Sequence, residues 1–416
     1  MSQLLKYLRQ QLPEKQVITD DLRRLAYGTD ASFYRLIPEV IAVVESEDEV
    51  RAVLQAARQH ATPVTFRAAG TSLSGQAISD GVLALIGEGF ATCEISADAS
   101  KVKAGPGIIG GEVNRRLAPH GRKIGPDPAS IGAAKIGGIA ANNASGMCCG
   151  TAQNSYRTVA GMRVVLADGT VLDTEDPGSV AAFRRSRGDL LDGLAALAAE
   201  TRQDEGLAER IRHKFKIKNT TGYSLNALVD FTDPVDILAH LMIGSEGTLG
   251  FISRITYRTV VEDPCKASAL VFFPTIEAAC EAVIRLKPQP VSAVELLDRP
   301  ALRSVQDKAG LPPLIKTLGD GAAALLIEVR AADRVELEEK MAAALGALEG
   351  IATVEPKQAW TDVARLGLYG VPALNFGPGL TAQAHKRDEH ALAPMIAENY
   401  TMFHRFLTDG AEDVAH

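Results

Sequence analysis

Residues 67–76, with the sequence RAAGTSLSGQ, combine the residue types that bind an anionic group through the backbone. Gly70 and Gly75 bracket small and hydroxyl side chains, so that N–H groups and hydroxyls can approach a ligand closely. Arg67 adds a positive charge, and the apolar run at 63–66 indicates that a buried strand leads into the loop. The segment therefore predicts a site for an anion; a glycine- and serine-rich surface turn is the other interpretation.

A second group of small residues follows at 125–128 and 137–146. Two such loops in one domain indicate a long ligand that lies over exposed backbone. Tight packing of a helix on a strand is the alternative explanation for so many glycines and alanines.

The five cysteines, at positions 93, 148, 149, 265 and 280, form no C-x-x-C pair. This spacing excludes a ferredoxin-type iron–sulfur run and a zinc ribbon within the chain. Cys148 and Cys149 are adjacent, and because vicinal cysteines make only strained disulfides we assign them no catalytic role. Thiols in a chain without a signal peptide indicate a reducing compartment.

The composition is that of a globular protein of at least two domains: 416 residues, 46% hydrophobic and 23% charged. A net charge of −7 argues against nucleic acid as a partner. The sequence contains no run of 18 apolar residues, so it predicts no membrane span. The first residues carry charges and glutamines where a signal peptide needs an apolar core, and they predict a short amphipathic helix.

The elements that would position these loops alternate between strand and helix. A helical lead-in at 1–35 comes first, followed by strands at 39–44, 63–66 and 82–86, a helix at 47–60, a β-rich stretch at 99–106 and a helix at 110–117. Asp168 and Gly169 predict a hairpin turn, and residues 179–215 have helical character. After residue 264, strands at 267–273, 290–295 and 322–329 with helices at 276–286 and 333–348 predict a βαβ-type α+β module.

Four segments carry a resemblance to a known family, in the order in which that family has them: 38–50, 67–76, 219–228 and 243–250. Residues 36–260 resemble the FAD-binding domain of the FAD-linked oxidases of the vanillyl-alcohol-oxidase or PCMH type. Within the family the motifs are most similar to those of D-lactate and D-2-hydroxy-acid dehydrogenases of the FAD plus iron–sulfur type. The resemblance implies an α+β fold, with a two-subdomain FAD-binding domain at 36–262 and a partial substrate or cap domain at 263–362.

The resemblance also implies where FAD would bind. Backbone amides and hydroxyls of the first loop would hold the pyrophosphate, whereas Arg67 would neutralise charge or form a salt bridge inside the domain. Thr71 stands where some relatives carry a histidine that holds FAD covalently, so non-covalent FAD is expected. The expected cofactor-binding residues are Arg67, Ala69, Gly70, Thr71, Ser72, Leu73, Ser74, Gly75, Gln76, Pro126, Asp127, Gly137, Gly138, Ala141, Asn142, Asn143, Ser145, Gly146, Glu246, Gly247, Gly250 and Ile252.

A dehydrogenase of this type needs a base for the substrate hydroxyl and a cation for the carboxylate. Lys218, Asn219 and Tyr223 are candidates on the substrate side, although Lys218 also suits a solvated surface. Arg330 would serve the carboxylate or pair with a carboxylate of its own domain. The histidine-rich segment that binds metal and substrate in relatives is not found, so we assign no catalytic residue and no metal ligand.

The last part of the chain, residues 363–416, resembles a different family, the zinc-dependent deacylases and dipeptidases that include succinyl-diaminopimelate desuccinylase. The sequence NFGPG at 375–379 precedes His385, which matches a metal ligand there, but the other ligands have no counterpart upstream. Residues 393–408 have the apolar spacing of a packing helix. The chain therefore resembles a join of two families, with the cap domain cut short.

Together these patterns predict an FAD-dependent oxidoreductase that oxidises a D-2-hydroxy acid by hydride transfer to flavin N5, impaired if the cap is truncated. Its partners would be the hydroxy acid and an electron acceptor, either an iron–sulfur module or protein, or a quinone or cytochrome. It would be cytoplasmic, or peripheral to a membrane through that acceptor. The alternatives are a flavin-binding remnant without turnover, a zinc-dependent deacylase fragment, and a reductase of the cell-wall enolpyruvyl type that uses NADPH.

Overall fold

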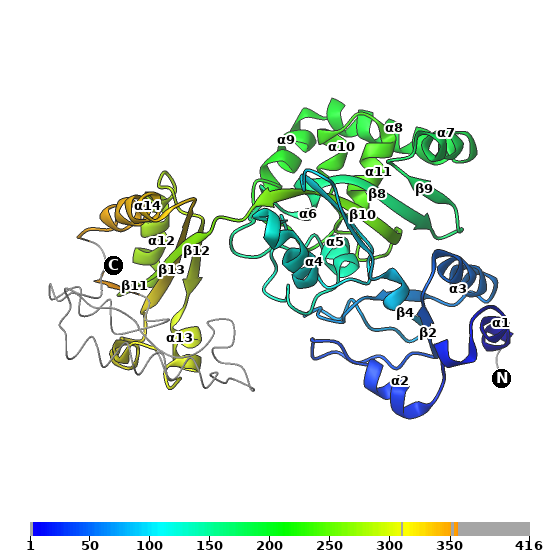
Figure 1. Ribbon diagram of the computed structural model, residues 1–416, viewed down its shortest axis with the longest axis horizontal. Coiled ribbons are helices and arrows are strands. Elements are labelled where there is room, and N and C mark those ends of the chain that lie inside the picture. Colours follow the sequence, from blue (N-terminus) through cyan, green and yellow to red (C-terminus); the bar gives the residue numbers. More distant parts are fainter. Residues whose placement is uncertain (1–2, 309–310, 351–352, 357–416) are drawn as a thin grey trace. The chain divides into compact units, whose positions relative to one another are not determined.

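The protein folds into two compact units that divide between Pro264 and Cys265. A computed structural model describes residues 3–308, 311–350 and 353–356, and Figure 1 shows the elements in chain order. The division lies close to the expected boundary between residues 262 and 263. The helical lead-in belongs to the first unit, because Leu4 and Leu8 are buried in the core of its first sheet.

The first unit begins with a four-stranded sheet. Its strands are, in order across it, β1 (Val17–Ile18), β2 (Val40–Val44), β4 (Val82–Ile86) and β3 (Val64–Arg67). Strands β2, β4 and β3 are parallel, and β2 and β4 are continuous apolar runs, as expected of strands covered on both faces. Helices α1 (Gln3–Gln11) and α3 (Glu47–Gln59) cover one face, and α2 (Asp21–Tyr27) packs against the other.

The second sheet of this unit is antiparallel. Its strands are β5 (Cys93–Ile95), β6 (Lys101–Ala104), β10 (Gly250–Val261), β8 (Val159–Leu166) and β9 (Val171–Asp173), and β7 (Arg122–Ile124) pairs with the far end of β10. The helices of this half are α4 (Gly110–Leu117), α5 (Ile136–Asn142), α6 (Ser155–Thr158), α7 (Pro177–Ser186), α8 (Gly188–Gln203), α9 (Glu205–Lys214), α10 (Ala227–Asp230) and α11 (Pro234–Met242). Side chains from α4, α5, α8, α10 and α11 share one core with β8 and β10.

The two sheets of the first unit also share a core. Val165 and Phe251 point away from the helices of the second sheet and join the cluster that α1 and α3 form with the first sheet. The ring centroid of Phe251 lies 4.9 Å from that of Phe66 and 5.3 Å from that of Phe90. This apolar contact fixes the end of β3, from which the first glycine-rich loop departs, beside the start of β10.

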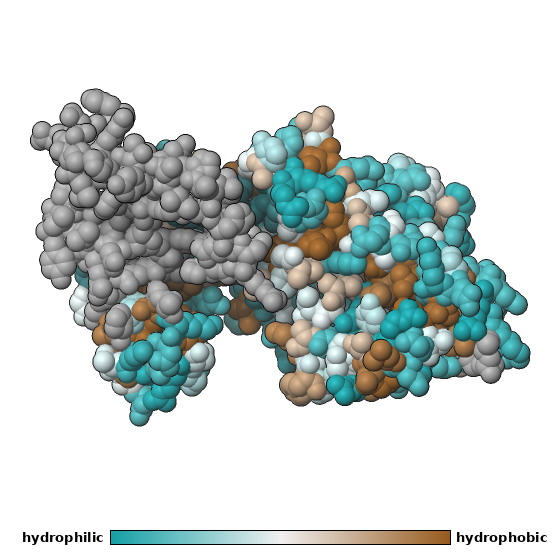
Figure 2. All heavy atoms as spheres, turned by 60° about the horizontal axis from the view of Figure 1, so that its bottom comes forward, coloured by the Kyte–Doolittle hydropathy of each residue, from teal (hydrophilic) through white to brown (hydrophobic). Residues whose placement is uncertain are grey.

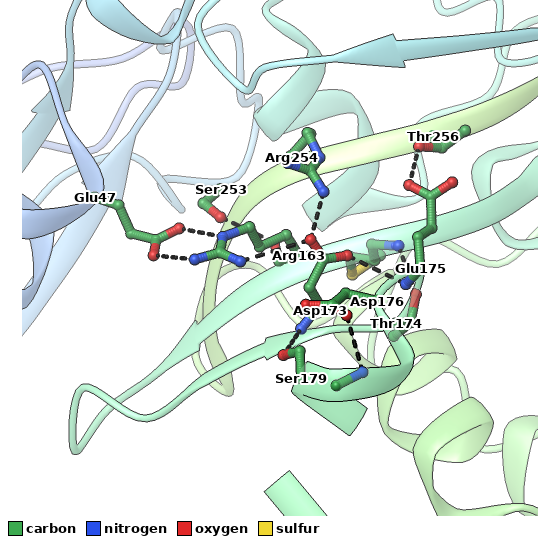
Figure 3. A network of polar contacts seen from close by, with 12 residues as sticks. Glu47, Arg163, Asp173, Thr174, Glu175, Asp176, Ser179, Ser253, Arg254 and Thr256 are labelled. Carbon is green, nitrogen blue, oxygen red and sulfur yellow. Dashed lines mark hydrogen bonds and ion pairs between the residues drawn. The ribbon is translucent and has the colours of Figure 1, made fainter. Parts of the chain in front are cut away.

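A polar network joins the two sheets as well (Figure 3). The Arg163 guanidinium on β8 donates two hydrogen bonds of 2.8 Å to the carboxylate of Glu47, in the first turn of α3. Asp173 on β9 accepts from Arg254 of β10 and also lies 3.5 Å from Arg163. Glu47 and Asp173 therefore each face a guanidinium.

The second unit is a split βαβ fold. Its elements are β11 (Cys265–Phe273), α12 (Ile276–Leu286), β12 (Ala293–Leu297), α13 (Arg299–Val305), β13 (Ala323–Ala331), α14 (Arg334–Gly346) and β14 (Thr353–Pro356). The order across the sheet is β12-β13-β11-β14, and all neighbours are antiparallel. Helices α12 and α14 cover one face, and α13 with the short helical turn Pro313–Thr317 covers the other.

The sequence patterns agree with most of these elements. The predicted hairpin is formed by β8 and β9; Gly169 has a φ of 85°, and the Thr170 N–H donates to the Asp168 carboxylate. The helical stretch at 179–215 is divided into α7, α8 and α9. The α+β class is confirmed. In the second unit β11 and β12, joined by α12, are parallel without being adjacent, and so are β13 and β14, joined by α14.

The surface of the first unit carries hydrophobic residues among hydrophilic ones (Figure 2). Leu22 on α2 and Phe33 in the loop that follows are 78% and 87% exposed, and the Phe33 ring lies 4.4 Å from that of Tyr34. Over the described residues, none of the helices has both the length and the apolar character needed to cross a bilayer.

Candidate functional site

One cavity of about 630 Å³ in the first unit collects the segments that the sequence singles out. Its wall comes from the loop after β3, from α5 and the loops around it, from residues 218 and 220–222 and from the turn that leads into β10. The predicted cofactor residues in this wall are Ala69, Gly70, Thr71, Ser72, Leu73, Ser74, Gln76, Gly137, Gly138, Ala141, Asn142, Ser145, Glu246, Gly247, Gly250 and Ile252. The predicted residues outside it are Arg67, Gly75, Pro126, Asp127, Asn143 and Gly146.

The loop after β3 is shaped by its glycines and by one serine. Gly70 and Gly75 have φ values of 72° and 79°, which side chains rarely adopt. The Ser72 hydroxyl accepts hydrogen bonds from the N–H groups of Ser74 and Gln76, at 3.1 and 3.3 Å. These bonds turn the chain tightly, and the residues on either side line the cavity.

Arg67 holds this loop in place through hydrogen bonds to the backbone around it. Its Nη1 donates to the carbonyl oxygens of Tyr27, Thr29 and Ala77, at 3.1, 2.8 and 3.2 Å. Burial lowers the pKa of the guanidinium, and the nearby Asp30 opposes that shift. A Cβ on Gly70 would overlap the guanidinium, so glycine at this position lets the loop lie directly on Arg67.

Asp127 and Asn143 organise the segment around α5. The Asp127 carboxylate accepts from the N–H groups of Gly146, Cys148 and Cys149, at 2.8, 3.2 and 3.1 Å. Asn143 ends α5 in the left-handed conformation, with a φ of 52°, and its Oδ1 accepts from the N–H of Tyr156. Both side chains hold backbone that borders the cavity.

The wall on the α5 side offers space and an unused hydroxyl. A Cβ on Gly138 would come within 3.4 Å of the Ala68 side chain, so that a larger side chain there would cross the gap between the two loops. Ser145 is 8% exposed, and its Oγ has no hydrogen-bond partner in the described part of the chain. An unpaired buried hydroxyl in a cavity wall is available to a ligand.

Glu246 is the acidic residue of the wall. It adopts a φ of 53°, its N–H donates to the Ala141 carbonyl at 2.9 Å, and its Oε1 accepts from Asn142 Nδ2 at 2.5 Å. Burial raises the pKa of the carboxyl, and the hydrogen bond from Asn142 limits the rise. Gly247 follows with a φ of 75°, next to the Phe66 ring.

Two lysines bring positive charge to the wall. Lys218, a candidate from the sequence, lines the cavity. Lys135 also lines it, although the sequence reasoning passed over it; its Nζ donates to the Ile86 carbonyl at 2.9 Å. The sequence does contain a signal for Lys135, because it is a single cation directly before the glycine-rich start of α5.

The other substrate-side candidates lie elsewhere. Asn219 and Tyr223 are outside the cavity wall, and the Tyr223 hydroxyl lies 2.8 Å from that of Thr248. Arg330, in the second unit, donates from Nε to Glu328 at 2.6 Å. Of the two roles considered for Arg330, the structure shows the pairing with a carboxylate of its own unit.

Neither the cysteines nor a cluster of metal-binding side chains forms a second site among the described residues. All five cysteines are free thiols, and burial raises the pKa of Cys149 to about 11. No group of three or more histidine, cysteine or acidic side chains suited to a metal occurs within the described ranges. His385 and the rest of the expected hydrolase-like segment, 363–416, lie outside the described residues.

Two protein families match the chain. Residues 38–175 match the FAD binding domain, and residues 263–366 match the C-terminal domain of the FAD linked oxidases. The D-lactate dehydrogenase of Archaeoglobus fulgidus is 27% identical over 76% of this chain and 60% of its own length. Glycolate oxidase subunit GlcD of Bacillus subtilis is 26% identical over 73% and 54%, and D-2-hydroxyglutarate dehydrogenase of Pantoea ananatis is 29% identical over 56% and 23%. The chain thus spans six-tenths or less of the length of these relatives.

Solved structures show the same fold at lower identity. Alkyldihydroxyacetonephosphate synthase matches with a TM-score of 0.60 and 15% identity, over 87% of this chain and 64% of that one. p-Cresol methylhydroxylase with substrate bound matches with a TM-score of 0.58 and 15% identity, over 89% and 70%.

A two-sheet unit with a glycine-lined cavity, followed by a split βαβ unit, defines a flavin-binding protein of the PCMH type. The chain belongs to the FAD-linked oxidases, and FAD is its cofactor.

Proposed function

We propose that the protein is an FAD-dependent dehydrogenase that oxidises a D-2-hydroxy acid of the D-lactate kind. The observation that carries the proposal is the cavity in the first unit, whose wall brings together four separate segments rich in glycine and small residues. The substrate class is supported by the relatives, which include a D-lactate dehydrogenase and D-2-hydroxyglutarate dehydrogenases. The C-terminal match, to a domain of FAD linked oxidases, supports an oxidoreductase over a simple flavin carrier.

The wall suits FAD in its shape and in its polar groups. The loop at 68–76 would hold the pyrophosphate with backbone N–H groups and hydroxyls, and Lys135 or Lys218 would balance its charge. Ser145 would give its unused hydroxyl to the cofactor. The gap beside Gly138 would accept a flat or extended part of the ligand between the two loops.

We expect the FAD to be held without a covalent bond. The described wall of the cavity contains no histidine, cysteine or tyrosine, which are side chains able to attach a flavin. Thr71 follows Gly70 at the position where some members of the family have the linking histidine.

Bound FAD supplies the two-electron acceptor for the hydrogen that leaves the Cα of the hydroxy acid. Ile139, Phe251 and Ile252 line the cavity with apolar surface that excludes water. Burial raises the pKa of Glu246, and its carboxyl accepts a hydrogen bond from Asn142 at the cavity wall. Electrons would then pass to an acceptor outside the described chain, an iron–sulfur module or protein, or a quinone or cytochrome.

The test is an absorption spectrum of the purified protein before and after anaerobic addition of D-lactate, D-2-hydroxyglutarate or glycolate. We expect a yellow protein whose flavin band bleaches with a D-2-hydroxy acid and stays unchanged with L-lactate. Dithionite serves as the control that the flavin is reducible. A band that dithionite bleaches and none of the hydroxy acids affects would contradict the proposed activity while leaving FAD binding intact.

A further inference from the structure

Arg299 is a buried cation with unused donors in the second unit. The residue is 6% exposed, yet its Nε and Nη1 have no hydrogen-bond partner within the described residues. It begins α13, directly after Asp298, whose carboxylate is used to cap that helix through the N–H of Ala301 at 2.9 Å. A guanidinium carries five N–H donors and no acceptor, so the unused nitrogens of Arg299 can only be satisfied by an acceptor.

The other cations of this unit are differently arranged. Arg303, one turn further along α13, is half exposed and pairs with Asp320. Arg330 is partly buried, with 16% of its side chain exposed, and pairs with Glu328 at 2.6 Å, and Lys316 pairs with Asp307 at 2.9 Å. Arg299 thus differs from its neighbours in combining burial with the lack of a carboxylate in the described chain.

A buried charge without a partner is strongly unfavourable, and proteins retain one where an anion completes it. A guanidinium recognises planar oxyanions, and carboxylates in particular, through its fixed set of N–H donors. An ionic hydrogen bond between Arg299 and a carboxylate would be stronger here than in water, because the surroundings are apolar: Leu302 of α13 packs into a cluster with Phe272 and Ile315.

We propose that Arg299 is the anchor of a carboxylate-binding site in the second unit. The ligand is a small carboxylic acid, either the hydroxy acid that is oxidised or a second acid that binds as an effector. The proposal extends the proposed function when the carboxylate is that of the substrate, but the binding test does not depend on turnover.

The first experiment is calorimetric titration of the purified full-length protein with 2-hydroxyisobutyrate, which has no hydrogen on Cα and cannot be oxidised. Its amide, 2-hydroxyisobutyramide, is the uncharged control. We expect the wild-type protein to bind the acid and not the amide, and Arg299→Gln to weaken binding of the acid at least about tenfold, the effect of losing charge-assisted hydrogen bonds. The affinity of Arg299→Lys for the acid should lie between those of the wild type and Arg299→Gln. Arg303→Gln removes the same charge from an exposed position and should bind as the wild type does.

Two further measurements identify the source of the carboxylate and guard against misfolding. A KM for D-lactate that rises in Arg299→Gln assigns the site to the substrate; weaker titration with an unchanged KM assigns it to an effector. Without ligand, Arg299→Gln should melt at the same temperature as the wild type or higher, because an unpaired buried charge is removed.

Equal affinity of Arg299→Gln and the wild-type protein for the acid would overturn the inference. So would melting temperatures that fall in both Arg299→Gln and Arg299→Lys without ligand, because the guanidinium would then be paired by the protein itself. If no hydroxy acid reduces the flavin, the proposed function fails, and the titration still decides the role of Arg299.

Discussion

Glu246 combines two unfavourable features at the wall of the cavity. A non-glycine residue in the left-handed region carries a conformational cost of about 1 kcal/mol, and a carboxyl out of water resists ionisation. Its backbone N–H bond to Ala141 and its side-chain bond to Asn142 hold it there. Unfavourable backbone conformations that the surrounding structure holds in place cluster at ligand-binding sites.

The Glu246 carboxyl should make the apoprotein less stable as the pH rises. Its folded-state pKa is raised, so above the ordinary value the unfolded chain loses a proton that the folded chain retains. The stability contribution is complete below the ordinary pKa of 4.5 and is lost as the pH rises through the higher folded value. Glu246→Gln keeps an acceptor for Asn142 and removes this pH dependence.

Urea unfolding of the apoprotein at several pH values checks this prediction. The free energy of unfolding of Glu246→Gln should match that of the wild type near pH 4, exceed it as the pH rises through the folded pKa, and stay higher up to pH 8. A constant difference across this range would show that Glu246 titrates normally.

At the scale of elements, the contact of α3 with β8 and β9 depends on charge as well as on apolar packing (Figure 3). Burial disfavours the charged form of Glu47, but the hydrogen bonds from Arg163 and Ser253 and the charges of Arg163 and Arg51 outweigh it. The net effect is a pKa of Glu47 below the ordinary value. The bond to Arg163 is bidentate, which adds orientation to attraction.

Glu47→Gln should lower the free energy of unfolding at neutral pH by about 1.5–3 kcal/mol, the range for hydrogen bonds to charged groups. The contribution is present above the ordinary pKa of 4.5 and is lost as the pH falls through the lower folded value, so the two proteins should converge in acid. Asp48→Asn is the matched control, since Asp48 is 92% exposed and pairs with Arg51 at 3.5 Å; it should change stability by less than about 0.5 kcal/mol. Equal effects of the two substitutions on urea unfolding would contradict this role of the network.

The sequence predicted the elements with strong local patterns better than those formed by distant pairing. The capped, amphipathic segment at 47–60 was expected and is α3 at Glu47–Gln59, whereas β7 was not expected, because its three residues are strands only through pairing with β10. Glycine-rich loops marked most of the cavity wall, since small residues are visible in sequence. Lys135 and Arg299 were missed, because their surroundings are set by tertiary packing and a lysine or arginine at a helix start is usually exposed.

At the scale of the whole molecule, each unit has cores of its own. The first unit closes around the clusters of its two sheets, and the second closes around the two faces of its split βαβ sheet. Every residue of the cavity wall, from Phe66 to Ile252, belongs to the first unit. The proposed FAD site therefore lies within the first unit, whereas the carboxylate site proposed at Arg299 lies within the second.

This division predicts that a fragment of residues 1–264 folds by itself and binds FAD. Its dissociation constant, measured by flavin fluorescence quenching, should equal that of the full chain within about twofold, as expected for changes remote from a site. The fragment should fail to bind 2-hydroxyisobutyrate, because it lacks Arg299. Gly138→Val, which places a branched side chain against Ala68, should abolish FAD binding in the fragment and in the full chain alike. A folded but colourless fragment beside a yellow full-length protein would show that the second unit takes part in holding the cofactor.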